Sequence, residues 1–385
     1  MTTISTEPSD PAFDTRVNLV RPVLPTFEEM ASEIREILAS GMVTKGRYLR
    51  LFEEAVAEHL GVQHAVAVSS CTAGLMLAYR CLGLTGDVVV PSFTFMATVS
   101  ALIWAGARPI FADVDRQTHN LDPGAVEAAI TPRTSAIVAA HIFGNPADVE
   151  ALQEIADRHR VKLVFDAAHG FGALYRGAPV GPQSDVQVYS LSPTKLLIAG
   201  EGGIVATNDG DLADRVRWGR EYGNSGGYDS AFAGMNARMP EINAVMGLHS
   251  LRKLEEAAQR RNELVSLYRQ ELGRLPGIGF QLVRPGDRCS YKDFSITVDP
   301  DAFGLTRDDL AEALNARNVD TRAYYDPPVH RQTAYRQYWD GRPLPVTDLL
   351  AERSLSLPLW SRMDGELVLG ICRAVAAIHE QRSSS

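Results

Sequence analysis

The sequence predicts an α/β protein in which a mostly parallel β-sheet carries helices on both faces, followed by a smaller C-terminal α+β domain. Between about residues 60 and 210, short β-branched runs alternate with amphipathic helical stretches, a pattern typical of parallel sheets. The alternation stops near Pro240, where a long helical stretch begins. With 385 residues, the chain is also longer than one compact core usually allows. We therefore expect a disordered N-terminus over residues 1–16, a large domain over residues 17–250 and a small domain over residues 251–385.

The strands of the large domain are expected where apolar, β-branched runs are bounded by glycine or polar residues. In chain order they are His64–Val68, Asp87–Val90, Pro109–Asp113, Ser135–Ala140, Lys162–Phe165, Val186–Ser190 and Gly203–Thr207. Helices are expected between several of these strands, where the apolar residues recur with helical spacing. They are Thr72–Leu82, which Gly83 ends, Ala97–Ala105, and a stretch from Ala147 to about His159.

A long helical stretch is expected from Glu241 to about Gly273, because Pro240 suits its first turn, and Gly277 and Gly279 break it. The further expected elements of the small domain are a strand over Phe294–Val298, a helix over Thr306–Ala316, a proline-rich loop over Tyr324–His330 and a frayed tail over Ser383–Ser385.

Composition excludes several classes of function. The net charge is −9, from 38 basic and 47 acidic residues, and no block of like charge marks a nucleic-acid or membrane surface. The four cysteines form no C-x-x-C pair, so neither a disulfide framework nor a structural metal is expected. The polar N-terminus resembles no signal peptide, and no apolar run could span a membrane. We expect a cytoplasmic protein.

In open parallel sheets, ligands bind at the carboxyl ends of the strands, so the segments that follow the expected strands are candidates for chemistry. Val68-Ser-Ser-Cys-Thr-Ala-Gly74 leads into a helix through small residues, whose backbone amides can approach a phosphate at the helix N-terminus. An ordinary helix cap is the alternative. Phe95 follows the next strand and could stack on a planar cofactor ring, with core packing as the alternative.

Two further segments carry titratable groups. Asp166 ends an apolar strand and can pair with a protonated pyridine nitrogen, while His169 could reach a phenolic oxygen of the same ring. A helix cap and a satisfied core histidine are the alternatives. Lys195 lies between Ser190-Leu-Ser-Pro-Thr and the glycine-rich Ala199–Gly203, where desolvation would lower the pKa of its amine and make it nucleophilic. Taken alone, Lys195 would be a surface lysine, and Ser190 could add a phosphate contact.

Together these segments supply a phosphate cradle, a stacking ring, an acid for a ring nitrogen and a Schiff-base lysine. The motifs of other enzyme classes, G-x-S-x-G, G-x-x-x-x-G-K-[ST] and H-E-x-x-H, do not occur. A metal-dependent hydrolase or a hydroxyl-nucleophile triad would leave most of the segments unexplained. The combination predicts pyridoxal 5'-phosphate as the cofactor.

The chain resembles the DegT/StrS nucleotide-sugar aminotransferases, which are fold type I pyridoxal-phosphate enzymes. The likeness covers roughly residues 18–375 and adds two motifs in the second half of the chain. The motifs that carry it are Ser69-Ser-Cys-Thr-Ala73, Val90-Pro-Ser-Phe-Thr-Phe95, Phe165-Asp-Ala-Ala-His169, Ser192-Pro-Thr-Lys195 with Gly200-Glu-Gly-Gly203, Gly234-Met-Asn-Ala-Arg-Met-Pro-Glu241 and Arg322-Ala-Tyr-Tyr-Asp-Pro-Pro-Val-His330.

The resemblance implies a role for each matching position. Lys195 and Asp166 match the catalytic lysine and the partner of the pyridine nitrogen, and Phe95 and His169 match ring contacts. Cys71, Thr72 and Ser190 match phosphate-binding positions, although glycine is usual where Cys71 stands, and a backbone with φ above zero there would put its contact in doubt. Asn236 matches a residue that reaches the phosphate from the partner subunit of an obligate homodimer, with Arg238 as the alternative for this contact. The positions expected to contact substrate are Tyr325, His330 and Arg238.

Similarity alone also implies a substrate. Asn-Ala-Arg-Met, Thr-Ala-Gly-Leu and Thr-Arg-Ala-Tyr look most similar to enzymes that aminate dTDP-4-keto-6-deoxy-D-glucose, with L-glutamate as the amino donor, in secondary metabolism. A dTDP-4-ketopentose, a 3-keto sugar and a non-catalytic regulatory relative stay open as alternatives. A related dehydratase is disfavoured, because those relatives carry histidine where Lys195 stands.

Overall fold

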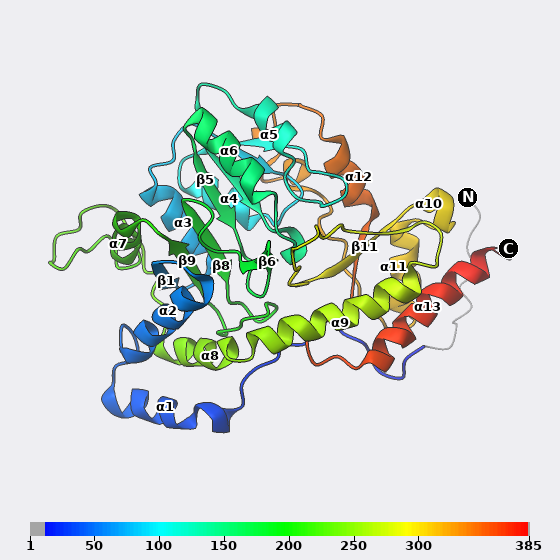
Figure 1. The fold of residues 1–385 in the computed structure, drawn as a ribbon, viewed down its shortest axis with the longest axis horizontal. Coiled ribbons are helices and arrows are strands. Elements are labelled where there is room, and N and C mark those ends of the chain that lie inside the picture. Colours follow the sequence, from blue (N-terminus) through cyan, green and yellow to red (C-terminus); the bar gives the residue numbers. More distant parts are fainter. Residues whose placement is uncertain (1–11, 384–385) are drawn as a thin grey trace.

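The computed structural model describes residues 12–383, which form a large domain around a seven-stranded sheet and a smaller domain at the other end of the molecule (Figure 1). The strands of the large sheet, in spatial order, are β1 (His64–Val68), β9 (Gly203–Thr207), β8 (Val186–Ser190), β5 (Lys162–Asp166), β4 (Thr134–Ala140), β2 (Asp87–Pro91) and β3 (Arg108–Ala112). Only β9 runs antiparallel to its neighbours. The predicted mostly parallel sheet is therefore confirmed.

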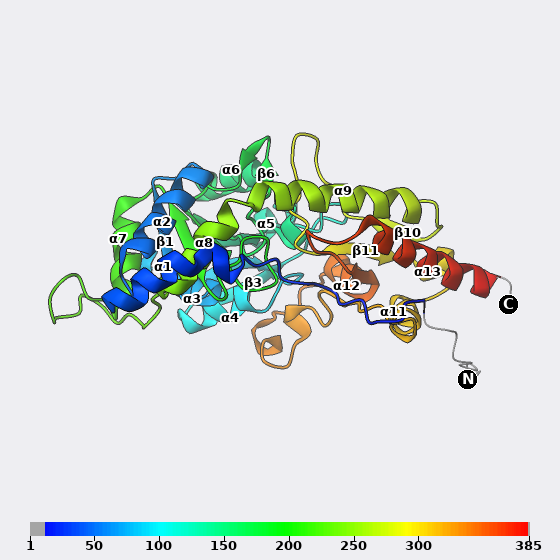
Figure 2. The ribbon, with the colours of Figure 1, turned by 90° about the horizontal axis from the view of Figure 1, so that it is seen from below.

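Helices cover both faces of this sheet because the strand residues alternate between two apolar cores (Figure 2). One core packs against α3 (Cys71–Cys81), α4 (Ala97–Trp104) and α7 (Gly210–Gly219). The other core packs against α1 (Phe27–Ser40), α2 (Arg47–Leu60), α5 (Pro123–Ala129), α6 (Val149–His159) and α8 (Glu241–Leu251). A short hairpin of β6 (Leu174–Tyr175) and β7 (Ala178–Pro179) lies apart from the sheet.

The small domain is built on a three-stranded antiparallel sheet with helices packed against it. Its strands are β10 (Ile278–Phe280), β11 (Phe294–Val298) and β12 (Ser354–Leu357). Its helices are α9 (Leu254–Leu272), α10 (Pro300–Phe303), α11 (Arg307–Ala316), α12 (Pro345–Arg353) and α13 (Gly365–Ser383). Figure 1 shows α9 and α13 side by side along one edge of the molecule.

The single long helix predicted after Pro240 is wrong, because the chain turns at Arg252 and Lys253 and separates α8 from α9. At this break the Ser250 hydroxyl accepts a hydrogen bond from the Ile198 amide at 3.0 Å, which ties the turn to the loop after β8. Leu254 then packs in the core of the large domain, whereas the later part of α9 packs in the small domain.

The N-terminal boundary also needs correction. Residues 12–16 belong to the expected disordered segment, yet Phe13 packs against the core of the small domain, and Arg16 forms an ion pair with Asp320 at 2.5 Å. Val17, expected in the large domain, is buried in the same small-domain core. Residues 1–11 and 384–385, where the rest of the N-terminus and most of the expected frayed tail fall, lie outside the described residues.

The direction of the strands decides where chemistry can occur. Because β1, β2, β5 and β8 are parallel, their carboxyl ends lie along one edge of the sheet. β9 runs the other way, so Gly203 at its start pairs with Val68 and Ser190 at this same edge. Within residues 12–383, no helix has the length and apolar character needed to cross a membrane.

Candidate active site

A cavity of about 320 Å³ lies at the carboxyl edge of the large sheet, between the two domains. Residues that follow β1, β2, β5 and β8 contribute to it, and so do residues of the small domain. Of the residues selected from the sequence, those that line it are Cys71, Thr72, Phe95, Asp166, His169, Ser190, Lys195 and Tyr325.

The first turn of α3 forms one wall of the cavity. Ser70 is the N-cap, and its hydroxyl accepts a hydrogen bond from the Ala73 amide at 3.1 Å. The amides of Cys71 and Thr72 have no partner within the helix, as expected for its first positions, and remain available for an anion. Gly203 permits this arrangement, since a Cβ there would come within 2.7 Å of the Cys71 nitrogen. Cys71 has a helical backbone, so its contact needs no glycine.

Asp166 ends β5 inside the cavity and is only 6% exposed. Thr98 Oγ1 donates a hydrogen bond to its carboxylate at 2.7 Å, and the Ala168 amide donates another at 3.1 Å. Burial raises the pKa of Asp166, whereas these two hydrogen bonds act in the opposite direction. A cationic ring nitrogen beside it would further favour the carboxylate form.

Lys195 lies on the loop after β8, which the Lys195 amide closes by donating to the Ser192 carbonyl at 3.0 Å. Burial lowers the pKa of Lys195 to about 8, with a smaller contribution from the nearby cation of Lys292. A substantial part of its amine is therefore neutral and nucleophilic near pH 8. Among the described residues, no hydrogen bond is made by its Nζ atom.

Three other predicted residues complete the walls near Lys195. Phe95 exposes 51% of its surface and is free to cover a planar ring, whereas Ser190 is buried at the end of β8. His169 lines the cavity, and burial followed by the cation of Lys195 lowers its pKa well below the ordinary value. His169 is therefore a neutral imidazole, able to donate or accept one hydrogen bond.

The sequence analysis missed several residues that lie in the cavity or directly behind it. They are Thr98, which holds Asp166, and the lining residues Glu201, Lys292, Asp293 and Tyr324. Thr98 lies three residues after Phe95, so its spacing from that residue could have found it. Lys292 and Asp293 follow no strand of the large sheet, and no local pattern marks them.

Three predicted residues are not brought to this cavity. Asn236 is exposed, and Arg238 forms an ion pair with Glu221 at 3.4 Å; neither lines the cavity of its own chain. The expected substrate contact of His330 is corrected to a structural role, since this side chain is 0% exposed. Its Nδ1 atom shares a hydrogen bond with Ser92 Oγ at 2.7 Å, which fixes the proline-rich loop to the end of β2.

The donor set of the cavity fits pyridoxal phosphate. The free amides at the start of α3 suit its phosphate, the buried carboxylate of Asp166 suits a protonated ring nitrogen, and the exposed face of Phe95 suits its ring. Lys195 supplies the amine that the cofactor needs for covalent attachment. The cofactor would also give the buried Asp166 carboxylate a cationic partner, and a buried charge without such a partner costs free energy.

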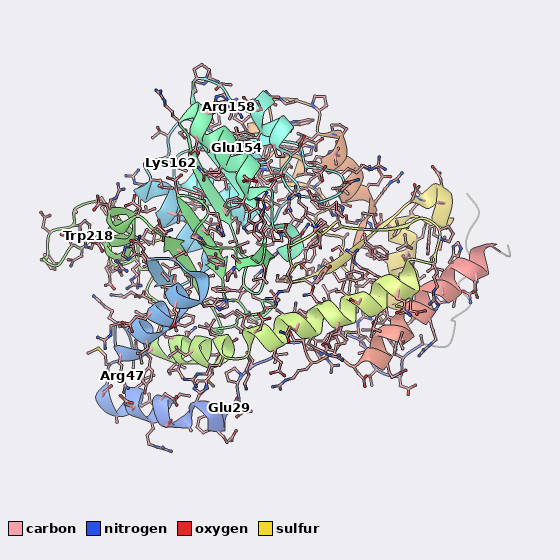
Figure 3. All side chains as sticks on the ribbon, viewed as in Figure 1. Glu29, Arg47, Glu154, Arg158, Lys162 and Trp218 are labelled. Carbon is pink, nitrogen blue, oxygen red and sulfur yellow. The ribbon has the colours of Figure 1, made fainter. Side chains whose placement is uncertain are left out.

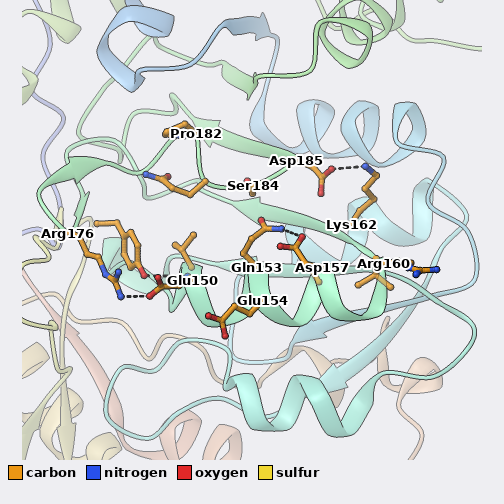
Figure 4. A pocket seen from close by; sticks show the side chains of 15 residues that line it. Glu150, Gln153, Glu154, Asp157, Arg160, Lys162, Arg176, Pro182, Ser184 and Asp185 are labelled. Carbon is orange, nitrogen blue, oxygen red and sulfur yellow. Dashed lines mark hydrogen bonds and ion pairs between the residues drawn. The ribbon is translucent and has the colours of Figure 1, made fainter.

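A larger hollow, of about 950 Å³, lies at the opposite edge of the sheet, where β5 and β8 begin (Figure 4). Two of its lining residues, Glu154 and Lys162, are labelled in Figure 3. Its charges are largely paired: Lys162 contacts Asp185 at 2.7 Å, and Arg176 contacts Glu150. Ligands of open parallel sheets bind at the carboxyl ends of the strands, so this hollow is not the candidate site.

Comparison with known proteins also indicates an aminotransferase. The profile of the DegT/DnrJ/EryC1/StrS aminotransferase family matches residues 26–376. A dTDP-3-amino-3,4,6-trideoxy-alpha-D-glucose transaminase from Streptomyces venezuelae is 37% identical over 359 residues, covering 91% of this chain and 93% of the relative. A dTDP-4-amino-4,6-dideoxy-D-glucose transaminase from Escherichia coli is 32% identical over 367 residues, covering 94% and 98%. The structure of DesI, determined in the presence of its TDP-sugar product, matches with a TM-score of 0.91 and 38% identity, covering 96% of this chain and 94% of DesI.

Proposed function

Because the chain belongs to the DegT/DnrJ/EryC1/StrS aminotransferase family, we propose a specific reaction within the activity of that family. The broader activity is pyridoxal-phosphate-dependent transamination of a nucleotide sugar. The proposed reaction transfers the amino group of L-glutamate to dTDP-4-keto-6-deoxy-D-glucose and forms dTDP-4-amino-4,6-dideoxy-D-glucose, for deoxysugar or antibiotic biosynthesis. The cavity in which Lys195, Asp166 and the amides of α3 meet carries the transaminase chemistry, whereas the choice of sugar rests on the similarity of motifs and on the name of a relative.

In this proposal the large domain binds the cofactor. The amides of Cys71 and Thr72, together with the Ser190 hydroxyl, hold the phosphate, and the dipole of α3 favours its negative charge. Phe95 covers the ring and His169 reaches its phenolic oxygen. When bound, pyridoxal phosphate supplies an electron sink for negative charge at the carbon that carries the amino group.

Two side chains handle protons. The Asp166 carboxylate keeps a proton on the ring nitrogen, and Thr98 fixes the orientation of this carboxylate. The Lys195 amine would take the proton from the α-carbon of the donor and hold it for transfer. Its lowered pKa suits this task, because an amine with a pKa of about 8 can both accept and release a proton near neutral pH.

The relatives support a sugar substrate and leave two positions for the amino group. The name of the Escherichia coli relative supports a 4-amino product, which agrees with the proposal. The name of the Streptomyces venezuelae relative supports a 3-keto sugar as the second candidate. In either case Tyr325, buried against the cavity, is proposed to contact the sugar.

We further propose that two chains share each site. Asn236 and Arg238 are partly or fully exposed beside the exposed apolar side chains of Val43 and Ile242, on a segment joined to Thr44 by a bridge at Pro240. An exposed apolar strip of this kind favours contact with a second copy. Across that interface Asn236 would reach the phosphate of the neighbouring site, with Arg238 near its substrate.

The test is to supply the purified enzyme with L-glutamate and a panel of dTDP-4-keto and dTDP-3-keto sugars. Product formation is followed by mass spectrometry, and NMR of the product gives the position of the new amine. We expect the highest kcat/KM for dTDP-4-keto-6-deoxy-D-glucose, and Lys195→Ala as the control should lose turnover. Preference for a 3-keto sugar would establish the second candidate substrate. Preference for a dTDP-4-ketopentose would replace the proposed hexose with a pentose. If no sugar is turned over, the chain is a regulatory relative.

A further inference from the structure

A buried ion pair lines the cavity and belongs to none of the groups that the proposed function assigns to the cofactor. Lys292 Nζ lies 2.8 and 2.9 Å from the two carboxylate oxygens of Asp293, and the two side chains are 7% and 6% exposed. Both line the same cavity as Lys195. A buried ion pair adds little to stability compared with apolar side chains of similar volume, so stability does not explain its presence.

The pair is held in place by the core of the small domain. Arg261 of α9, itself 2% exposed, donates hydrogen bonds from Nη1 to the carbonyl oxygens of Tyr291 at 2.8 Å and Lys292 at 3.0 Å. The Lys292 amide donates to the Phe143 carbonyl at 2.9 Å, which joins this segment to the large domain. The Lys292 ammonium also lies 5.4 Å from the centre of the Tyr324 ring. Its position is therefore fixed before any substrate binds.

Lys292 is the cation of the cavity that remains available to bind an anionic group of a substrate. Among the described residues that line the cavity, Lys195 and Lys292 are the only lysines or arginines, and Lys195 is committed to the cofactor. His169 is neutral, because its pKa is held well below its ordinary value. An ammonium has three N–H donors, of which Asp293 takes two and leaves one.

The two substrates of a transaminase place opposite demands on such a group. An amino-acid donor brings a carboxylate next to the reacting carbon, whereas a keto sugar brings uncharged hydroxyl groups to the same place. A lone buried cation would favour the first and penalise the second, because an unpaired buried charge is costly. With Asp293 beside it, Lys292 stays neutralised when the sugar is bound and still offers a charge-assisted hydrogen bond to a carboxylate.

We propose that the Lys292–Asp293 pair is the subsite for the α-carboxylate of the amino-acid donor. The inference rests on the proposed function, in that it assumes an amino acid and a sugar use the cavity in turn. It assigns donor recognition to the small domain and cofactor binding to the large domain. The pair thereby lets one place in the cavity accept the charged α-carboxylate of the donor and the uncharged hydroxyl groups of the sugar ring.

The test uses the cofactor-loaded double variant Lys292→Met/Asp293→Asn, in which no buried charge is left unpaired. Calorimetry measures the binding of α-methyl-L-glutamate, which lacks the proton that transamination removes. We expect its affinity to fall by about tenfold to a hundredfold, the range of one charge-assisted hydrogen bond. The affinity of the pyridoxamine-phosphate form for the nucleotide sugar should change by less than about twofold, because the variant replaces a neutralised pair with neutral side chains beside uncharged hydroxyl groups.

Three comparisons separate recognition of the carboxylate from a general effect on binding. Lys162→Met, a change at the opposite edge of the sheet, should leave both affinities unchanged. 4-Aminobutyrate is glutamate without its α-carboxylate, so its affinity should be the same for the double variant and the wild type. Lys292→Arg keeps the charge and should recover part of the donor affinity, which a purely structural role would not require.

Other outcomes would overturn the subsite. Weaker sugar binding with unchanged donor binding would assign Lys292 to the pyrophosphate, and equal weakening of both would indicate a structural role. If the double variant fails to fold, Lys292→Arg and Lys292→Met provide the same comparison. Failure of the wild type with every keto sugar would contradict the proposed function, whereas the calorimetric comparison would still decide the subsite.

Discussion

The reactivity of Lys195 depends on the charges that share its cavity. Burial, and then the cation of Lys292, lowers the pKa of its amine from 10.5 to about 8. Only the neutral amine can bind the cofactor covalently. The cofactor-free protein should therefore capture pyridoxal phosphate at a rate that rises with pH, has its midpoint near 8, and is constant above it. Initial rates of growth of the visible absorbance, measured across pH, test this.

Lys292→Met should move that midpoint to higher pH, because it removes a repelling cation and leaves the carboxylate of Asp293 near the amine. Lys162→Met serves as the matched control and should leave the midpoint unchanged. A midpoint close to 10.5 in the unaltered protein would show that the cavity does not perturb Lys195.

At the scale of residues, the sequence predicts those that follow sheet strands and misses those that reach the cavity by other routes. Asp166 and Lys195 could be selected because both lie just after a strand end, where the geometry of a parallel sheet requires ligands to bind. Lys292 and Asp293 come from an irregular segment of the small domain, and only the packing between domains brings them in. His330 was misplaced because a histidine beside prolines carries no sign of its burial.

At the scale of elements, the contact between β9 and α3 decides the shape of the phosphate site. In Gly203→Ala the new Cβ would lie within 2.8 Å of Ser70 backbone atoms and push α3 away. We expect a loss of unfolding free energy of about 1–3 kcal/mol, as for other overpacked positions, together with weaker binding of pyridoxal phosphate. Urea unfolding of the cofactor-free protein and titration with the cofactor measure these effects.

Gly210→Ala is the matched control, since a Cβ there meets only His64 Nε2, at 3.4 Å, and Gly210 begins α7 on the surface. It should leave both quantities close to the wild-type values. If Gly203→Ala is as stable as Gly210→Ala and binds the cofactor equally well, the close approach of β9 does not shape the site.

The elements themselves show what a local pattern can and cannot predict. The seven strands of the large sheet and β11 were predicted to within one residue at each end, because each is an apolar run with clear ends. The strands β6, β7, β10 and β12 were not predicted. Apolar periodicity does not reveal strand direction, so the antiparallel course of β9 needed the structure. The break between α8 and α9 was missed because no proline or glycine marks it, and the contact of Ser250 with Ile198 is a tertiary one.

At the scale of the whole molecule, the exposed position of Asn236 predicts complementation between two inactive chains. Lys195→Ala lacks the catalytic lysine, and Asn236→Asp places a charge that repels phosphate. If Asn236 acts across the dimer, a mixed dimer has one site with both changes and one intact site. Random exchange makes half of the dimers mixed, so activity should return to about a quarter of the wild-type value. Steady-state assays of the mixture after subunit exchange measure it.

Asn236→Ala mixed with Asn236→Asp provides the negative control, because every site then lacks the asparagine. The carbonyl of Ala237 accepts a hydrogen bond from the Ser69 amide of its own chain, so the segment also passes close to its own phosphate site. A mixture of Lys195→Ala and Asn236→Asp that remains as inactive as its components would assign Asn236 to the site of its own chain.

The position of Cys71 at the start of α3 also bears on how the protein withstands oxidants. Its thiol lines the cavity, but burial and the carboxylate of Asp166 raise its pKa well above the ordinary range. Oxidants and alkylating agents attack the thiolate, which is then almost absent at neutral pH. The sulfur atom can therefore stand beside an aldehyde-bearing cofactor and a nucleophilic amine without competing with either. Cys71 is therefore unreactive toward oxidants, and the enzyme should keep its activity in air without added reductant.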